Sequence, residues 1–113
     1  MEIQIREMHN VSIVDIKGKL AEQEANALLR DTVDSLLTKN KKKILLNLAE
    51  MEYIDSSGVG ELIQSMRAVE NLGGALKIVN PNSKIYNTLS ISLLLPTFDV
   101  SNNEEEAIAK FAV

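Results

Sequence analysis

The alternation of strand-like and helix-like segments is the feature that most narrows the folds open to this sequence. Residues 43–48 are rich in apolar side chains, which is typical of a buried strand. Apolar residues then recur at intervals of three and four over residues 59–72, which indicates a helix, and residues 75–79 form another strand-like run after two glycines. Because parallel strands are joined by such crossovers, the sequence predicts a parallel sheet from residue 43 onward.

The first part of the chain is predicted to add an antiparallel hairpin and a helix. Residues 2–8 and 11–17 carry the apolar faces of two strands, and residues 9–10 form a tight turn between them. Gly18 is expected to close the second strand. A helix follows, and it ends at the lysine-rich segment 39–43, where cations suit the negative end of the helix dipole. Its apolar residues, spaced by three and four, are Ala25, Leu28, Leu29, Val33, Leu36 and Leu37.

A third helix is predicted after the strand at residues 75–79. Residues 80–82 begin it, with Pro81 in its first turn. Proline suits this turn because the N–H groups of a first helical turn have no partner within the helix, so its missing N–H is no loss. Pro96 is expected to stop it. The apolar face of this helix consists of Ile85, Leu89 and Leu93.

A short edge strand and a last helix complete the predicted fold. The strand covers residues 97–100, and Ser101 with Glu104 resembles a capping box at the start of the helix. The apolar residues of this helix are Ala107, Ile108 and Phe111. The fold class is therefore α/β: residues 1–113 form a single domain whose mixed sheet, mostly parallel after the N-terminal hairpin, is packed with about four helices.

Composition excludes several classes of function. The net charge is −4, and there are two tyrosines, two phenylalanines and no tryptophan, which argues against direct binding of nucleic acid. The chain has no cysteine and a single histidine, so we expect no metal site and no cofactor. The N-terminus lacks the pattern of a secretion signal, and the longest apolar run, residues 93–95, is too short to cross a bilayer. We therefore expect a cytoplasmic protein without membrane insertion.

The candidate functional site is the corner where the strand beginning at residue 43 gives way to the next helix. It combines an acid, two hydroxyls and two glycines, in the order Asp55-Ser56-Ser57-Gly58-Val59-Gly60. The first turn of a helix has unpaired N–H groups and a partial positive charge, so it favours negative charge. One interpretation is structural, with Asp55 or Ser56 capping the helix. In the other, one of the two adjacent hydroxyls caps the helix while the other faces solvent and accepts a phosphate.

Enzymatic function is not supported by the residues around this corner. The only imidazole, His9, lies in the predicted hairpin turn, so neither serine is expected to have the base that a catalytic triad needs. The corner is not a Gly-x-Ser-x-Gly elbow, and it lacks the third glycine of a dinucleotide-binding fingerprint. We assign no catalytic residue and expect that the chain is not an enzyme. A hydrolase remains the enzymatic alternative. Such an enzyme would turn over generic ester substrates, and the Ser56→Ala substitution would abolish that activity.

The order of the elements and the Asp-Ser-Ser-Gly-hydrophobe-Gly corner resemble a stand-alone STAS domain of the bacterial anti-sigma factor antagonist type. The resemblance covers essentially the whole chain. It implies that Ser56, the serine directly after the aspartate, is the phosphoacceptor. The partner-binding residues that it implies are Asp55, Ser57 and Gly58, which shape the loop, with Val59 and Glu61 on the first turn of the helix.

The same resemblance implies the partners. In such proteins an anti-sigma factor that is also a serine kinase phosphorylates the acceptor with ATP, and a metal-dependent serine phosphatase reverses the reaction. The unphosphorylated antagonist binds the anti-sigma factor and thereby frees a sigma factor, which regulates transcription. ATP and metal belong to these partners, and the free antagonist is expected to be a monomer. Family members often have Gly-Glu-Leu-Asp where this chain has Gly18-Lys19-Leu20-Ala21, so an acid common near the phosphorylation loop is missing.

A second interpretation of the resemblance stays open. STAS modules also work by binding alone, without phosphorylation, as subunits of membrane lipid or anion transport systems. The intact pair Ser56 and Ser57 favours the phosphorylation switch over this alternative.

Overall fold

The computed structural model describes residues 1–91 and 98–111. Strands β1 (Glu2–Met8) and β2 (Val11–Leu20) form the predicted antiparallel hairpin. The two residues between them have positive φ angles of 52° and 66°. A two-residue turn of this kind matches the right-handed twist of the strands that it joins, and this explains why so short a turn suffices.

Strand β2 does not close at Gly18, which corrects the prediction from the sequence. The strand continues to Leu20, and Gly18 has a φ of +105°, a backbone conformation that favours glycine. The register of β2 against β3 (Lys43–Ile54) shifts between Gly18 and Lys19. Gly18 therefore permits an irregularity inside the strand rather than a turn at its end. The additional residues bring Leu20 beside the last residue of β3.

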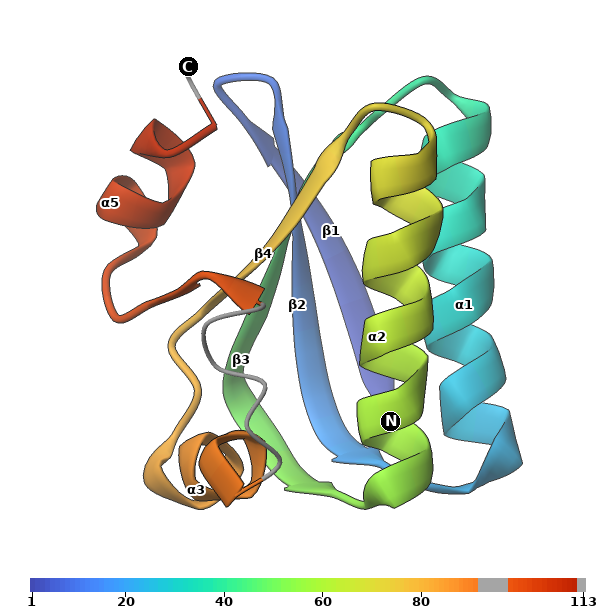
Figure 1. Ribbon diagram of the computed structural model, residues 1–113, viewed down its shortest axis with the longest axis vertical. Coiled ribbons are helices and arrows are strands. Elements are labelled where there is room, and N and C mark those ends of the chain that lie inside the picture. Colours follow the sequence, from blue (N-terminus) through green and yellow to red (C-terminus); the bar gives the residue numbers. More distant parts are fainter. Residues whose placement is uncertain (92–97, 112–113) are drawn as a thin grey trace.

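The five strands lie in the order β1-β2-β3-β4-β5, with β4 at Ala75–Val79 and β5 at Val100–Ser101. The hairpin pair is antiparallel, and all the other pairs are parallel. Helices α1 (Glu22–Thr38), α2 (Ser56–Asn71) and α3 (Ser83–Ile91) follow β2, β3 and β4 along the chain (Figure 1). The predicted mixed sheet, mostly parallel after the hairpin, is confirmed.

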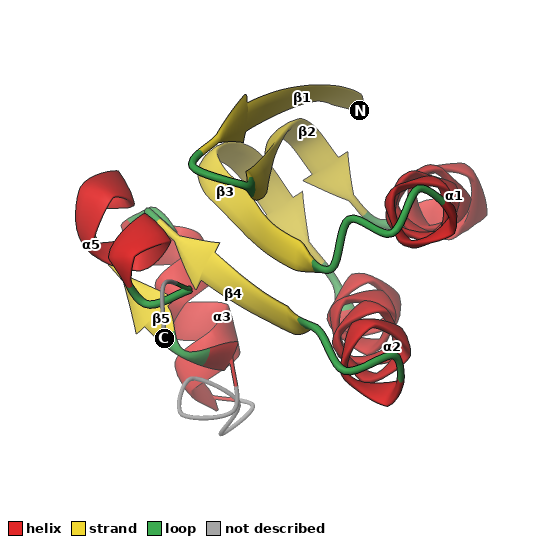
Figure 2. Cartoon of the chain, turned by 90° about the horizontal axis from the view of Figure 1, so that it is seen from above, coloured by secondary structure: helices red, strands yellow, loops and turns green. Residues whose placement is uncertain are grey.

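The helices lie on both faces of the sheet and at one of its ends. Helices α1 and α2 lie side by side over one face, and α5 (Glu104–Ala109) lies over the opposite face (Figure 2). Helix α3 is near the end of the sheet where β3 runs into α2 (Figure 1). Because both faces of β3 are covered, Ile44, Leu45 and Leu46 are all fully buried, and this accounts for the continuous apolar run in the sequence.

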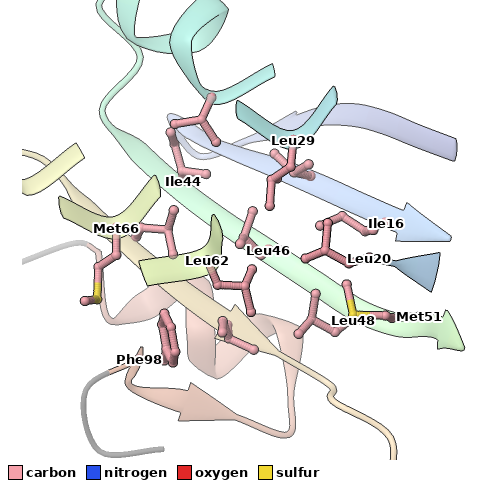
Figure 3. Packing of buried hydrophobic residues seen from close by; sticks show 14 of the residues in the cluster. Ile16, Leu20, Leu29, Ile44, Leu46, Leu48, Met51, Leu62, Met66 and Phe98 are labelled. Carbon is pink, nitrogen blue, oxygen red and sulfur yellow. The ribbon is translucent and has the colours of Figure 1, made fainter. Parts of the chain in front are cut away.

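Two groups of buried side chains hold these layers together. The larger group fills the space between the sheet and α1 and α2, where side chains from β2, β3 and both helices meet (Figure 3). Among its fully buried members are Ile16, Leu20, Leu29, Leu48, Met51 and Leu62. The smaller group lies under α5 and consists of Val11, Ile13, Leu45, Val79, Ala107, Ile108 and Phe111. The predicted apolar residues of the last helix are thus part of the core.

The start of α3 differs from the prediction. Pro81 precedes the helix instead of lying in its first turn, because the helix begins at Ser83. Asn82 provides the cap: its side-chain oxygen accepts a hydrogen bond from the backbone N–H of Ile85 (3.1 Å). Of the predicted apolar face, Ile85 and Leu89 are buried, whereas Leu93 and the predicted stop at Pro96 lie outside the described residues.

The predicted capping box of the last helix is wrong. Asn103, not Ser101, caps α5, and its side-chain oxygen accepts from the backbone N–H of Glu106 (3.0 Å). Ser101 lies in β5, where its hydroxyl accepts a hydrogen bond from the Lys110 ammonium (2.8 Å). The edge strand exists but is shifted: it begins at residue 100, and residue 97, where it was expected to begin, lies outside the described residues.

Candidate functional site

The corner between β3 and α2 is attached directly to the end of β2. Ile54, the last residue of β3, pairs with Leu20, the last residue of β2. The backbone N–H of Asp55 donates to the carbonyl oxygen of Leu20 (3.4 Å), and Gly58 packs against the same carbonyl so closely that no Cβ atom fits. The extension of β2 beyond Gly18 is therefore what supports the candidate site.

Asp55 caps α2, as one of the two interpretations from the sequence predicted. It has an extended backbone (φ −107°, ψ −175°), and its Oδ1 accepts from the backbone N–H of Gly58 (2.9 Å). The same Oδ1 accepts from the Ser57 hydroxyl (2.7 Å). These two donors, the hydroxyl first, hold the pKa of the Asp55 carboxyl below its usual value. The corner therefore carries a fixed negative charge at neutral pH.

The two serines of the corner have different environments. The Ser57 hydroxyl donates to Asp55 and accepts from the side-chain amide of Asn26 on α1 (2.9 Å). The Ser56 side chain is exposed, and within the described part of the chain its hydroxyl has no hydrogen-bond partner. Both serines are exposed, but in the described structure the Ser57 hydroxyl is hydrogen-bonded within the corner and the Ser56 hydroxyl is not.

The two residues that were expected to contact a partner from the first turn lie deeper than the serines. Val59 is 8% exposed and Glu61 is 7% exposed. The Glu61 carboxylate points to α1, where it accepts a hydrogen bond from the guanidinium of Arg30 (2.7 Å). This pairing raises the pKa of Arg30. The structure places Glu61 between the two helices, whereas Val59 is beside Ser56.

A shallow hollow lies next to Ser56 and was not predicted from the sequence. Its lining residues are Ile54, Asp55, Ser56, Val59, Thr88 and Ile91. Ile91, at the end of α3, is 83% exposed and extends the apolar side of this hollow. No residue of α3 was predicted to be functional, because only the tertiary fold brings α3 close to the corner.

Asn26 was also missed by the sequence analysis. It is 8% exposed and lies in the same stripe of α1 as the buried Leu29 and Val33. A polar residue in the buried stripe of a predicted helix was the only signal available. At the start of α1, Ala21 occupies the N-cap position and provides no side-chain cap.

The described residues contain neither a cluster of metal ligands nor a membrane-spanning helix. Across residues 1–91 and 98–111, no group of three or more histidine, aspartate or glutamate side chains is placed to hold a metal ion. In the same residues, no helix is both long enough and apolar enough to span a membrane.

Comparisons with known proteins agree with this fold. The family model for the STAS domain matches residues 2–107. A Thermotoga neapolitana protein whose name places it among anti-sigma factor antagonists is 29% identical over 101 residues, which cover 89% of each chain. The structure of the anti-sigma factor antagonist SpoIIAA in its unphosphorylated form has a TM-score of 0.80 and 24% identity, over 96% of this chain and 95% of that one. The phosphorylated form of SpoIIAA, described as a Bacillus cell fate determinant, has a TM-score of 0.73 and 23% identity, over 96% and 98%. With the family match over nearly its whole length and the sheet order described above, this chain belongs to the STAS domain family.

Proposed function

We propose that this chain is an anti-sigma factor antagonist that is switched by phosphorylation of Ser56. In its unphosphorylated form it binds an anti-sigma factor that is also a serine kinase, and a sigma factor is released for transcription. The kinase transfers phosphate to Ser56 and the complex weakens, until a serine phosphatase restores the binding form. The name of the Thermotoga relative and the solved SpoIIAA forms support this assignment. The chain acts by binding, and the catalysis is left to its partners.

The contrast between the two serines is the observation that carries the proposal. The Ser56 hydroxyl is exposed and has no partner among the described residues, so a kinase can reach it without breaking a bond of the fold. Asp55 already caps α2, so the helix does not depend on Ser56. A phosphate on the first turn of α2 is also close to the positive end of the helix dipole, which stabilises it.

Charge explains how one phosphate switches binding. Phosphorylation adds roughly −1.5 to −2 charges beside Asp55, whose carboxyl is already ionised. A partner that docks over the neighbouring apolar hollow strips water from that phosphate, which is unfavourable for a charged group. An acidic partner group at ~4 Å adds a repulsion of up to about 4 kcal/mol at an effective dielectric constant near 20, or about a thousandfold in affinity. The switch therefore acts on the interface and leaves the fold intact.

The acceptor is identified by mass measurement. The anti-sigma factor kinases of the organism that carries this chain are purified and incubated, one at a time, with ATP and the wild type, Ser56→Ala or Ser57→Ala. We expect one phosphoryl group on the wild type and on Ser57→Ala, and none on Ser56→Ala. Equal modification of Ser56→Ala and wild type would refute Ser56 as the acceptor. Failure of every kinase on the wild type would favour the alternative of a transport subunit that binds without phosphorylation.

A further inference from the structure

We propose that Asn26 is a positioning residue that determines which of the two adjacent serines accepts the phosphoryl group. Ser56 and Ser57 are both exposed, but Asn26 restrains the Ser57 hydroxyl by a hydrogen bond, so that the Ser56 hydroxyl is the one free to turn toward the kinase. This inference rests on the proposed function, since it concerns the same site. The proposal assigns a role at the corner to a residue of α1 that is far from the corner in sequence.

Three side chains from three segments form a continuous hydrogen-bonded chain. The Nδ2 of Asn26 on α1 donates to the Oγ of Ser57 on α2 (2.9 Å). That Oγ donates in turn to the Oδ1 of Asp55 in the loop (2.7 Å). Asn26 is 8% exposed, so its side chain is fixed by the packing between the helices. The Ser57 hydroxyl is thereby restrained on two sides.

This restraint bears directly on phosphoryl transfer. In the transfer, the serine Oγ forms a bond to the γ-phosphorus of ATP, the bond from that phosphorus to the bridging oxygen breaks, ADP leaves, and the hydroxyl proton passes to a base of the kinase. The oxygen must face the phosphorus in line with the leaving group. Ser57 has to break its bonds to Asn26 and Asp55 before its Oγ faces outward, whereas Ser56 has no such bond in the described structure.

The side-chain oxygen of Asn26 indicates that this residue does not serve stability alone. Its Oδ1 is buried and has no hydrogen-bond partner in the described residues. A buried acceptor without a partner is unfavourable, and an apolar side chain at this place would avoid that cost. In the part of the chain that the structure describes, the one bond that the Asn26 side chain makes is directed at Ser57. The geometry therefore links Asn26 to the orientation of that hydroxyl.

The test is to replace Asn26 in a variant that lacks the proposed phosphoacceptor, Ser56. The kinase that modifies the wild type is incubated with ATP and either Ser56→Ala or the double variant Ser56→Ala with Asn26→Ala. We expect phosphorylation of Ser57 to be up to about tenfold faster in the double variant, because one of its two restraining bonds is lost. With Asn26→Ala alone, the product should be a mixture of phosphoserine at positions 56 and 57. Asn26→Leu, which also lacks the donor but fills the site, is made in parallel in case the alanine variant does not fold.

Arg30→Met is the matched control. Arg30 also joins α1 to α2, one turn further along, but through Glu61 and not through Ser57. In the Ser56→Ala background it should leave the rate of Ser57 phosphorylation unchanged. Equal phosphorylation of Ser57 in the Arg30 and Asn26 variants would show that loosening of the helices, and not the bond from Asn26, exposes Ser57, and would overturn the proposal.

A measurement without a kinase separates this inference from the proposed function. The Hα–Hβ scalar couplings of Ser57 report its χ1 rotamer in solution. We expect a single rotamer in the wild type and in Arg30→Met, and averaged couplings in Asn26→Ala and Asn26→Leu. An unchanged rotamer in the Asn26 variants would contradict the role of Asn26, even if Ser56 proves to be the acceptor. Averaged couplings together with an unphosphorylated wild type would contradict the proposed function and leave the positioning by Asn26 standing.

Discussion

Gly58 on α2 is in contact with the carbonyl oxygen of Leu20 at the end of β2: a Cβ atom at residue 58 would lie 2.1 Å from that oxygen. The same Cβ would lie 2.8 Å from the Cγ1 of Ile54. The Leu20 carbonyl is backbone and also accepts from the N–H of Asp55, so it cannot move aside without disturbing the sheet and the corner together. This contact fixes α2 and both serines relative to the sheet.

Gly58→Ala should therefore destabilise the protein. We expect a loss of roughly 1–3 kcal/mol or more in the free energy of unfolding, because the methyl group meets backbone on one side and a packed side chain on the other. Denaturant unfolding followed by circular dichroism measures it. Gly60→Ala is the matched control, since a Cβ there meets nothing within 4 Å. It should stabilise α2 by about 0.5–1 kcal/mol, and equal effects of the two substitutions would contradict the contact.

The sequence predicted the existence of this corner but not its internal contacts. The change from a strand pattern to a helix pattern located Asp55 at the start of α2, and residue preference alone made it a candidate cap. The contacts of Gly58 with Leu20 and of Ser57 with Asn26 join residues more than thirty positions apart. Local patterns do not contain such pairings, because they depend on the register between strands and on how α1 packs against α2.

Because of the ion pair between Arg6 and Asp15, the free energy of unfolding should decrease at acidic pH. Arg6 binds the Asp15 carboxylate through Nε (2.6 Å) and Nη2 (2.9 Å), and Asn47 donates to it as well (2.8 Å). Arg6 first, and then Asn47, hold the pKa of Asp15 below its usual value. The stabilisation is thus complete above the pKa of the unfolded chain, about 3.9, and is lost as the pH falls through the lower pKa of the folded state.

Asp15→Asn tests this dependence. At pH 7 the variant should be less stable than the wild type. The difference in unfolding free energy should begin to shrink below about pH 4, where Asp15 of the unfolded chain becomes protonated, and vanish as the pH falls through the lower pKa of the folded state. Unfolding by denaturant at a series of pH values measures the difference. Asp31→Asn, on an exposed part of α1, is the control and should leave the acid dependence nearly unchanged. A constant difference between Asp15→Asn and wild type across the acid range would rule out this account.

Asn82 is expected to stabilise the start of α3 and its attachment to β3. Its Oδ1 caps the helix at Ile85, and its Nδ2 donates to the carbonyl oxygen of Met51 (2.6 Å). Asn82→Ala should cost about 1–2 kcal/mol in the free energy of unfolding, since it removes a cap and leaves a carbonyl without its donor. Asn87→Ala, on the exposed surface of the same helix, should cost far less. Similar losses in the two variants would contradict the bridging role of Asn82.

The corrected boundaries have a common physical cause. The sequence alone made Pro81 and Ser101 good starts for helices by local preference, but Asn82 and Asn103 lie where the chain leaves the sheet and take the caps instead. Gly18 looked like a strand end because glycine often marks turns, yet here it accommodates an irregularity within β2. In each case the tertiary position of the backbone, and not the local residue preference, decided where the element begins or ends.

The proposed switch requires that charge at Ser56 weakens a docking interaction. The direct measurement is the affinity of the purified anti-sigma factor for this chain with serine, or with phosphoserine built in during translation, at position 56. Circular dichroism of both forms confirms that the fold is the same. We predict that the serine form binds and that phosphoserine lowers the affinity by roughly a hundredfold or more. Equal affinities, or tighter binding of the phosphoserine form, would contradict the central claim.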